Sequence, residues 1–240
     1  MNRTSMRLWL FLMMMIIGGT KGKAQEKLDT KVSCDFVNQY IFRGQHCGDV
    51  SIQPTLGIIF KGLSLTAWGN VGLSNTNDTK EFDVTTAYSL NRFNIGIIDY
   101  WYDKGPDADS RYFRYNAHST NHLFEANIGY HFNPISFQWY TNFAGNDGLK
   151  SNGKRAYSSY AELSCPFHLL QCDWTATAGF VPFQTTFYSK VNRFAVTNLS
   201  LQTVKVIKMT KDFSVPVFAG ITANPSNGKA YLIFGVTIHP

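Results

Sequence analysis

The residues best able to do chemistry in this chain are charged and amide side chains at alternating positions of strand-like segments. Asp83 stands between Phe82 and Val84, and Glu125 follows Phe124. Successive side chains of a strand point to opposite faces, so each carboxylate shares a face with other polar groups. The same alternation gives the full set of candidates for a polar interior: Asp35, Arg43, Asp83, Glu125, Gln138, Asn142, Glu162 and Asp173.

These inward charges allow two interpretations. They can form a charged lumen that selects solutes, or a polar network that fills and braces a narrow barrel. About eight strands leave room only for side chains, whereas about sixteen enclose a channel. The segments found here number between these limits, so both interpretations stay open. Arg43 is the one clear inward base, which predicts a net negative wall and a preference for cations if a pore is open.

The elements that must position these residues are strands. Segments of alternating polarity are separated by breaks that alternate between tight and long, which is typical of outer-membrane barrels. An even number of strands places both termini of the barrel domain on the same side of the membrane. Boundaries carry an uncertainty of about two to four residues. The expected strands are 32–42, 52–60, 63–73, 81–90, 92–102, 121–132, 135–144, 155–164, 172–181, 194–207, 213–223 and 229–239.

The apolar faces decide the class of fold. The last segment, 229–239, shows Leu232, Phe234 and Val236 on a face without any polar group. Aromatic residues make up 15% of the chain and charged residues only 16%, a charge-poor composition for a soluble domain. A band of apolar and aromatic side chains on every strand fits lipid outside and a polar interior. The sequence therefore predicts an all-β fold, a closed antiparallel transmembrane β-barrel of about twelve strands.

Two positions resist this pattern. Asp99 falls on the apolar face of its segment, and a carboxylate in lipid costs several kcal/mol. We therefore expect a bulge near Ile97-Ile98 that turns Asp99 inward. Asn38 falls on the face of Phe36, and alternation offers no reason for it.

The N-terminal segment 1–24 is expected to be a cleaved signal peptide, which leaves 25–240 as the barrel domain. It has Arg3 and Arg7 before an apolar run at 8–17, and small residues end it at Ala24. The basic charge of the chain, +6 in total, is concentrated in this segment, so it does not indicate nucleic-acid binding.

The serine, histidine and cysteine residues bear on catalytic, metal and disulfide chemistry. Ser151 lacks the histidine two residues earlier that an outer-membrane phospholipase uses, because Leu149 stands there. We expect no enzyme, no cofactor and no metal site, since the histidines lack metal-ligand spacing. Cys165 and Cys172 flank one predicted turn and are expected to form a disulfide. Cys34 and Cys47 are expected to stay apart.

Parts of the chain resemble known outer-membrane families. The run 35–44, Asp-Phe-Val-Asn-Gln-Tyr-Ile-Phe-Arg-Gly, resembles the first strand of the TorF-type porins, and 51–57 is similar to their second. Stretches similar to a related group of outer-membrane proteins follow at 65–69, 99–101, 143–145, 153–158 and 223–225. The resemblance covers most of the chain after residue 24. It implies a small barrel of the Gram-negative outer membrane.

These observations together predict a passive, porin-like channel of the cell outer membrane for small hydrophilic solutes. The alternative is a non-transporting barrel with a structural or surface-binding role. The expected partners are outer-membrane lipid, lipopolysaccharide, the barrel assembly machinery and small solutes, without nucleic acid.

Overall fold

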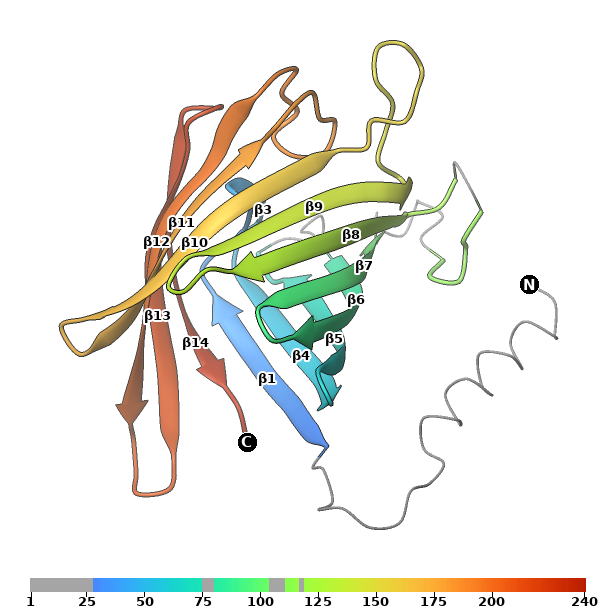
Figure 1. The fold of residues 1–240 in the computed structure, drawn as a ribbon. Coiled ribbons are helices and arrows are strands. Elements are labelled where there is room, and N and C mark those ends of the chain that lie inside the picture. Colours follow the sequence, from blue (N-terminus) through green and yellow to red (C-terminus); the bar gives the residue numbers. More distant parts are fainter. Residues whose placement is uncertain (1–27, 75–79, 104–110, 117–118) are drawn as a thin grey trace.

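The computed structural model describes residues 28–74, 80–103, 111–116 and 119–240 (Figure 1). The expected signal peptide, 1–24, lies outside the described residues, as does part of the predicted loop 103–120. No helix among the described residues is long and apolar enough to cross a membrane.

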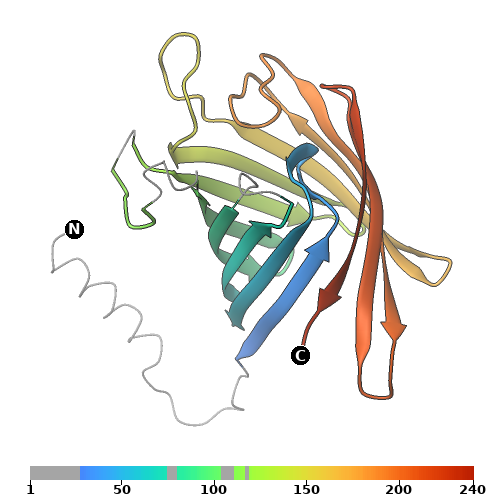
Figure 2. The ribbon, with the colours of Figure 1, turned by 180° about the vertical axis from the view of Figure 1, so that it is seen from behind.

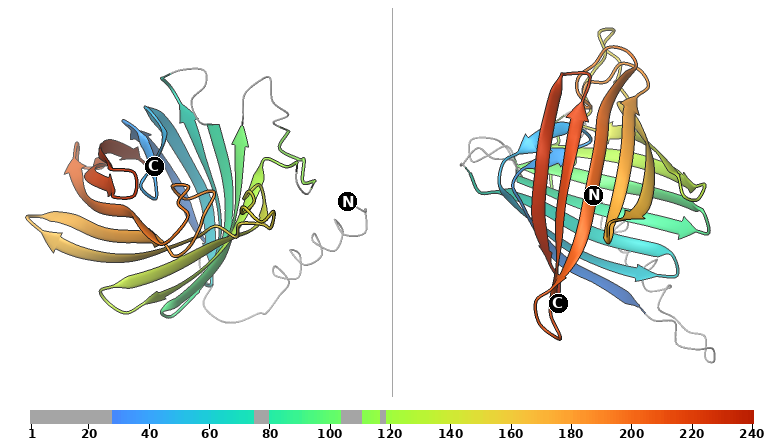
Figure 3. Two further views of the ribbon diagram at one scale, coloured as in Figure 1. Left: turned by 90° about the horizontal axis from the view of Figure 1, so that it is seen from above. Right: turned by 90° about the vertical axis from the view of Figure 1, so that its left-hand side faces the viewer.

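Twelve antiparallel strands close into a barrel, which confirms the predicted fold class. Strand β1 closes the ring because it pairs with β4 on one side and with β14 on the other. Figure 3 shows the ring from above. The strands of the wall are β1 (Asp29–Val37), β4 (Ser51–Phe60), β5 (Leu63–Gly72), β6 (Lys80–Leu90), β7 (Phe93–Asp103), β8 (His122–His131), β9 (Ser136–Gly145), β10 (Ser159–Leu169), β11 (Cys172–Val181), β12 (Ala195–Lys208), β13 (Ser214–Asn224) and β14 (Lys229–Ile238).

The wall is apolar outside and polar inside, the reverse of a soluble core. Large hydrophobic side chains are exposed along the strands, with Ile95 at 52% and Phe234 at 55%. The buried residues of the described chain include more polar than apolar ones, among them Gln53, Asn70 and Glu125. Alternation along each strand produces both faces at once. This distribution is the one expected for a barrel with lipid around it.

Short turns gather at one end of the barrel, where β1 begins and the chain ends (Figures 1 and 2). We call this the short-turn end and the opposite one the long-loop end. Lys61 and Gly62 have φ of 50° and 80°, which is the left-handed geometry of a two-residue hairpin turn. Leu170 and Gln171 adopt a similar turn. The predicted break at 165–171 is therefore wrong, because β10 continues to Leu169.

The predicted first strand, 32–42, is divided in two. The wall strand β1 ends at Val37, and the chain then forms a separate hairpin of β2 (Tyr40–Phe42) and β3 (Gln45–Gly48). Asn38 lies at the point where the chain leaves the wall. Its Nδ2 donates to the Leu232 carbonyl at 2.9 Å, and its Oδ1 accepts from Phe234 N at 2.8 Å. The side chain thus continues the hydrogen bonds to β14 while the backbone leaves the wall.

The expected bulge at Ile97-Ile98 is wrong. Strand β7 pairs with both neighbours without a register shift, and Asp99 stays on the outward face. Its carboxylate is not left in lipid, because His122 Nδ1 lies 2.7 Å from Asp99 Oδ1. Residues 111–116, which we call the outer arm, cover this pair from outside: His122 Nε2 lies 2.5 Å from the Tyr112 carbonyl oxygen, and the Tyr115 ring stacks on His122.

The predicted disulfide between Cys165 and Cys172 is also wrong. Cys165 stands opposite Ala176 and Cys172 opposite Leu169, so four residues of β11 separate the two positions. Four residues of strand span about 13 Å, well beyond the reach of a disulfide. None of the four cysteines forms a disulfide.

Candidate functional site: a hairpin latched inside the barrel

The β2–β3 hairpin, 40–48, lies inside the barrel at the long-loop end (Figure 1), and we call it the inner arm. Its tip is Arg43-Gly44, with φ of 50° and 80°. A Cβ at Gly44 would lie 1.9 Å from the Thr197 carbonyl oxygen, so only glycine fits against β12. Two hydrogen bonds tie the arm to the wall and a loop: Asn224 Nδ2 donates to the Gly44 carbonyl at 2.9 Å, and Ser189 N donates to Gln45 Oε1 at 2.8 Å.

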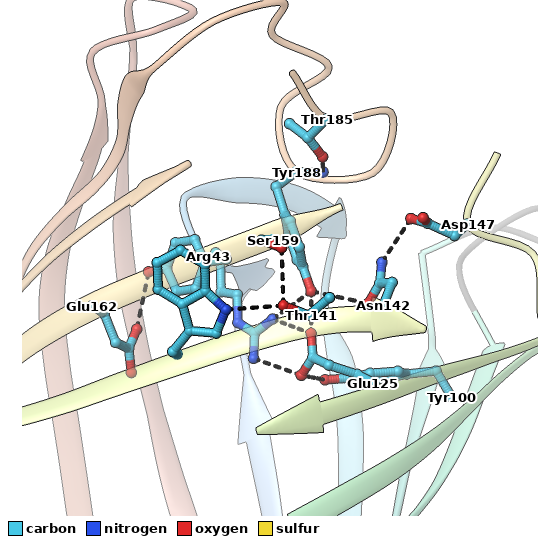
Figure 4. Close-up of polar contacts among 12 residues, drawn as sticks. Arg43, Tyr100, Glu125, Thr141, Asn142, Asp147, Ser159, Glu162, Thr185 and Tyr188 are labelled. Carbon is cyan, nitrogen blue, oxygen red and sulfur yellow. Dashed lines mark hydrogen bonds and ion pairs between the residues drawn. The ribbon is translucent and has the colours of Figure 1, made fainter. Parts of the chain in front are cut away.

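Arg43 forms a buried ion pair with Glu125 of β8 (Figure 4). Nη1 lies 2.6 Å from Oε2 and Nη2 lies 3.0 Å from Oε1, a bidentate arrangement. The side chains are 8% and 0% exposed. Separating the two side chains would leave each buried charge without its partner, which is unfavourable. The pair therefore holds the tip of the inner arm against the wall, and we call it the latch.

Aromatic rings surround the guanidinium. The Arg43 Cζ lies 3.8 Å from the centre of the Tyr140 ring and 4.8 Å from that of Tyr160. A ring face attracts a cation more strongly when both are shielded from water. These tyrosines therefore stabilise the arginine at the faces of its planar group, while Glu125 binds its edge.

Tyrosine hydroxyls complete the coordination of Glu125. Tyr100 donates to Oε1 at 3.0 Å, and Tyr188 donates to Oε2. Tyr188 belongs to the loop between β11 and β12 and not to a strand of the wall. Burial is the main reason that its pKa is raised well above the ordinary value, with Glu125 also contributing. The phenol consequently remains a neutral donor to the carboxylate.

A further shell holds these donors in place. The Tyr188 hydroxyl oxygen lies 3.2 Å from Asn142 Oδ1, and Asn142 Nδ2 donates to Asp147 at 3.0 Å. Asp147 in turn accepts from Ser158 N at 3.0 Å. The backbone N of Tyr188 donates to Thr185 Oγ1 at 3.0 Å. The loops at 146–158 and 182–194 are thus bound to the same network as the inner arm.

Two more carboxylates lie on the wall near the inner arm. Glu81 and Asp83 of β6 are 6% and 7% exposed. Asp83 stands opposite Trp68 and Tyr100 in the neighbouring strands, and the ring of Tyr40 in the inner arm lies 5.5 Å from that of Trp68. Asp83 Oδ1 has no hydrogen-bond partner among the described residues.

The structure brings only some of the predicted residues together. Arg43, Glu125 and Asn142 share one network. Glu162 is connected to this network through Tyr160, which donates to Glu162 at 2.9 Å and whose ring contacts Arg43. Three others lie apart, each with its own neighbour. Asp35 accepts from Thr237, Gln138 donates to Asn94, and Asp173 lies beside His168 with 84% of its side chain exposed.

Sequence reasoning missed the tyrosines of this site. Tyr100 and Tyr140 stand on the polar faces of their strands, and that placement could have revealed them. Tyr188 lies in a loop, where no periodicity applies. Alternation predicts Arg43 as an inward-facing residue just after the first wall strand, 32–42, whereas it lies at the tip of the inner arm.

The arrangement is suited to holding a segment inside a polar barrel. The described residues contain no group of three or more His, Cys, Asp or Glu side chains that could hold a metal ion. The chain matches no family model and no curated protein. The geometry of the barrel and its inner arm therefore carries the functional argument.

Proposed function

We propose that the protein is an outer-membrane barrel through which small hydrophilic solutes diffuse, and that the inner arm is its constriction. The resemblance to TorF-type porins supports this proposal, as does the apolar exterior of the wall. In that setting lipopolysaccharide and lipid surround the barrel, the assembly machinery inserts it, and the long-loop end faces outward. The role is passage of solutes rather than catalysis.

One observation carries the proposal: the arm is a separate hairpin latched to the wall, not part of it. Its tip is held by side chains, chiefly the pair of Arg43 with Glu125. A barrel needs no such hairpin to close, because β1 pairs directly with β4 and β14. A segment of this kind narrows the lumen and can be displaced without opening the wall.

Conductance in a planar bilayer tests the proposal. The wild-type protein should show small or brief openings. Arg43→Gln removes the charge that holds the arm and should lengthen or enlarge them. Arg155→Gln is the matched control, because Arg155 donates to the Gly145 carbonyl at the end of β9 and makes no hydrogen bond to the inner arm in the described part of the chain, so the openings should stay unchanged.

The second candidate is a barrel that transports nothing, with a structural or surface-binding role. The close packing of Arg43 among Tyr140, Tyr160 and Glu125 favours it. Absence of conductance in both the wild type and Arg43→Gln would establish this alternative and reject the channel.

A further inference from the structure

A polar pocket lies under the tip of the inner arm. It has a volume of about 190 Å³, and its walls come from the inner faces of β10 to β13. Arg43 and Gly44 form part of its lining together with Glu162 and Asn198. Water occupies about 30 Å³ per molecule in the liquid, so the pocket suits a small solute rather than a single water.

One buried hydrogen-bond acceptor of this pocket has no donor in the described chain. Asn198 is only 7% exposed, and its Oδ1 has no partner among the described residues. Its Nδ2 already donates to the Tyr160 hydroxyl at 3.1 Å. A buried acceptor without a partner is unfavourable, so a solute that donates a hydrogen bond at this point is stabilised.

The carboxylate of this pocket, Glu162, is not bound by a cation among the described residues. Glu162 accepts one hydrogen bond, from Tyr160, and the described part of the chain shows no ion pair on it. Arg43 does not neutralise Glu162, because both of its terminal nitrogens are bound to Glu125. Figure 4 shows Glu162 and Glu125 on separate sides of the guanidinium. The pocket thus combines a carboxylate and an orphaned acceptor with hydroxyls from Thr177, Ser200 and Thr222.

We infer that this pocket binds small organic ammonium solutes that also carry hydroxyl groups. A primary ammonium has donors only and a positive charge, which match Glu162 and Asn198 Oδ1. Hydroxyls of the solute can both donate and accept, as the threonine and serine side chains do. The inference deepens the proposed function, because it names the class of solute that pauses beneath the constriction.

Binding is measured by ligand-observed NMR on the folded protein in detergent micelles, with empty micelles as the blank. The probes are 3-amino-1,2-propanediol, glycerol and glycerate, which share one carbon skeleton and differ in charge. The ammonium probe should bind about tenfold more tightly than glycerol, and glycerate should bind least. Equal binding of all three would show that the pocket does not recognise the ammonium charge, and no binding would show that none of these solutes enters it. Either result would overturn the inference.

Two variants of pocket residues and one control locate the site. Glu162→Gln should weaken binding of the ammonium probe about tenfold. Asp173→Asn removes one carboxylate from an exposed position near the short turn and should change nothing. Thr222→Val removes a hydroxyl from the pocket without changing its charge and should weaken binding about threefold, so it tests the site even if Glu162→Gln fails to assemble. Unchanged binding in Thr222→Val and Glu162→Gln would place the probe elsewhere.

The two proposals fail separately. Binding in micelles requires no open pore, so a silent bilayer with intact binding would remove the channel and keep the pocket. Conductance without binding would keep the channel and remove the pocket.

Discussion

The inner arm (40–48) and the outer arm (111–116) both belong to the long-loop end of the barrel, yet they lie on opposite faces of its wall. The inner arm is held by Arg43 and Glu125, with side chains 8% and 0% exposed. The outer arm covers His122 and Asp99, with side chains 0% and 18% exposed. The carboxylate at the inner arm, Glu125, is paired with a cation of that arm, whereas Asp99 is paired with His122 of the neighbouring wall strand β8.

The two arms differ in where the charged partners come from. Arg43 belongs to the inner arm itself, so this arm is bound to the wall by a charge-assisted, bidentate pair. Asp99 and His122 both belong to wall strands, and the outer arm contributes the Tyr112 carbonyl and the Tyr115 ring. The comparison teaches that the inner arm carries its own ionic latch, whereas the outer arm is latched onto a carboxylate–histidine pair that is already part of the wall.

Breaking the inner latch should have the largest effect. Glu125→Gln leaves the Arg43 charge buried without its carboxylate, and such a loss costs about 3–5 kcal/mol. The measurement is the free energy of unfolding by urea in lipid vesicles. The double variant Arg43→Met/Glu125→Leu should recover most of the loss, because it buries no charge. A single variant as stable as the wild type would show that the arm contributes nothing to the fold.

The identity of the two faces can be tested at neighbouring positions of β9. Phe137→Arg places a charge on the outward face and should cost about 2–4 kcal/mol near the middle of the bilayer. Gln138→Arg places it inside and should be tolerated better, since Gln138 already lies among polar groups such as Asn94. The yield of heat-modifiable barrel on a gel measures both. Asn142→Arg should fail to assemble despite facing inward, because Asn142 is completely buried in the inner network.

Breaking the outer latch should have a smaller effect. Asp99→Asn removes the charge opposite His122 but keeps an acceptor, and the loss should be about 1 kcal/mol. Trypsin cleavage at Arg111 and Arg114 should become faster while the barrel stays heat-modifiable. Cleavage at the wild-type rate would show that the pair does not hold the outer arm.

The smallest expected effect is that of pH. The inner arm should not respond when the pH is raised from 6 to 9. The raised pKa of Tyr188 means that its stabilising contribution is complete below the usual tyrosine value of about 10 and is lost only when the pH rises through the raised value. Conductance changes over pH 6–9 would contradict this.

Local periodicity determined the wall. Apolar residues at every second position, as at Leu232, Phe234 and Val236, specify a strand and its lipid-facing side within a few residues of sequence. The tight turn at Lys61-Gly62 is similarly local. The number of strands and the closed antiparallel fold followed from these signals alone. Pro166 interrupted the pattern, so the end of β10 was misjudged although the strand continues past it.

The tertiary structure alone decided what lies inside the barrel. Arg43 and Glu125 are separated by 82 residues, and no local pattern relates positions so distant. Alternation states which face a side chain occupies, but not which loop or hairpin will meet it there. Asn38 and Asp99 are irregularities of the pattern for the same reason: each is explained by a partner from another strand, β14 in one case and His122 of β8 in the other. Burial of charge favours such pairings only once the barrel has brought the partners within reach.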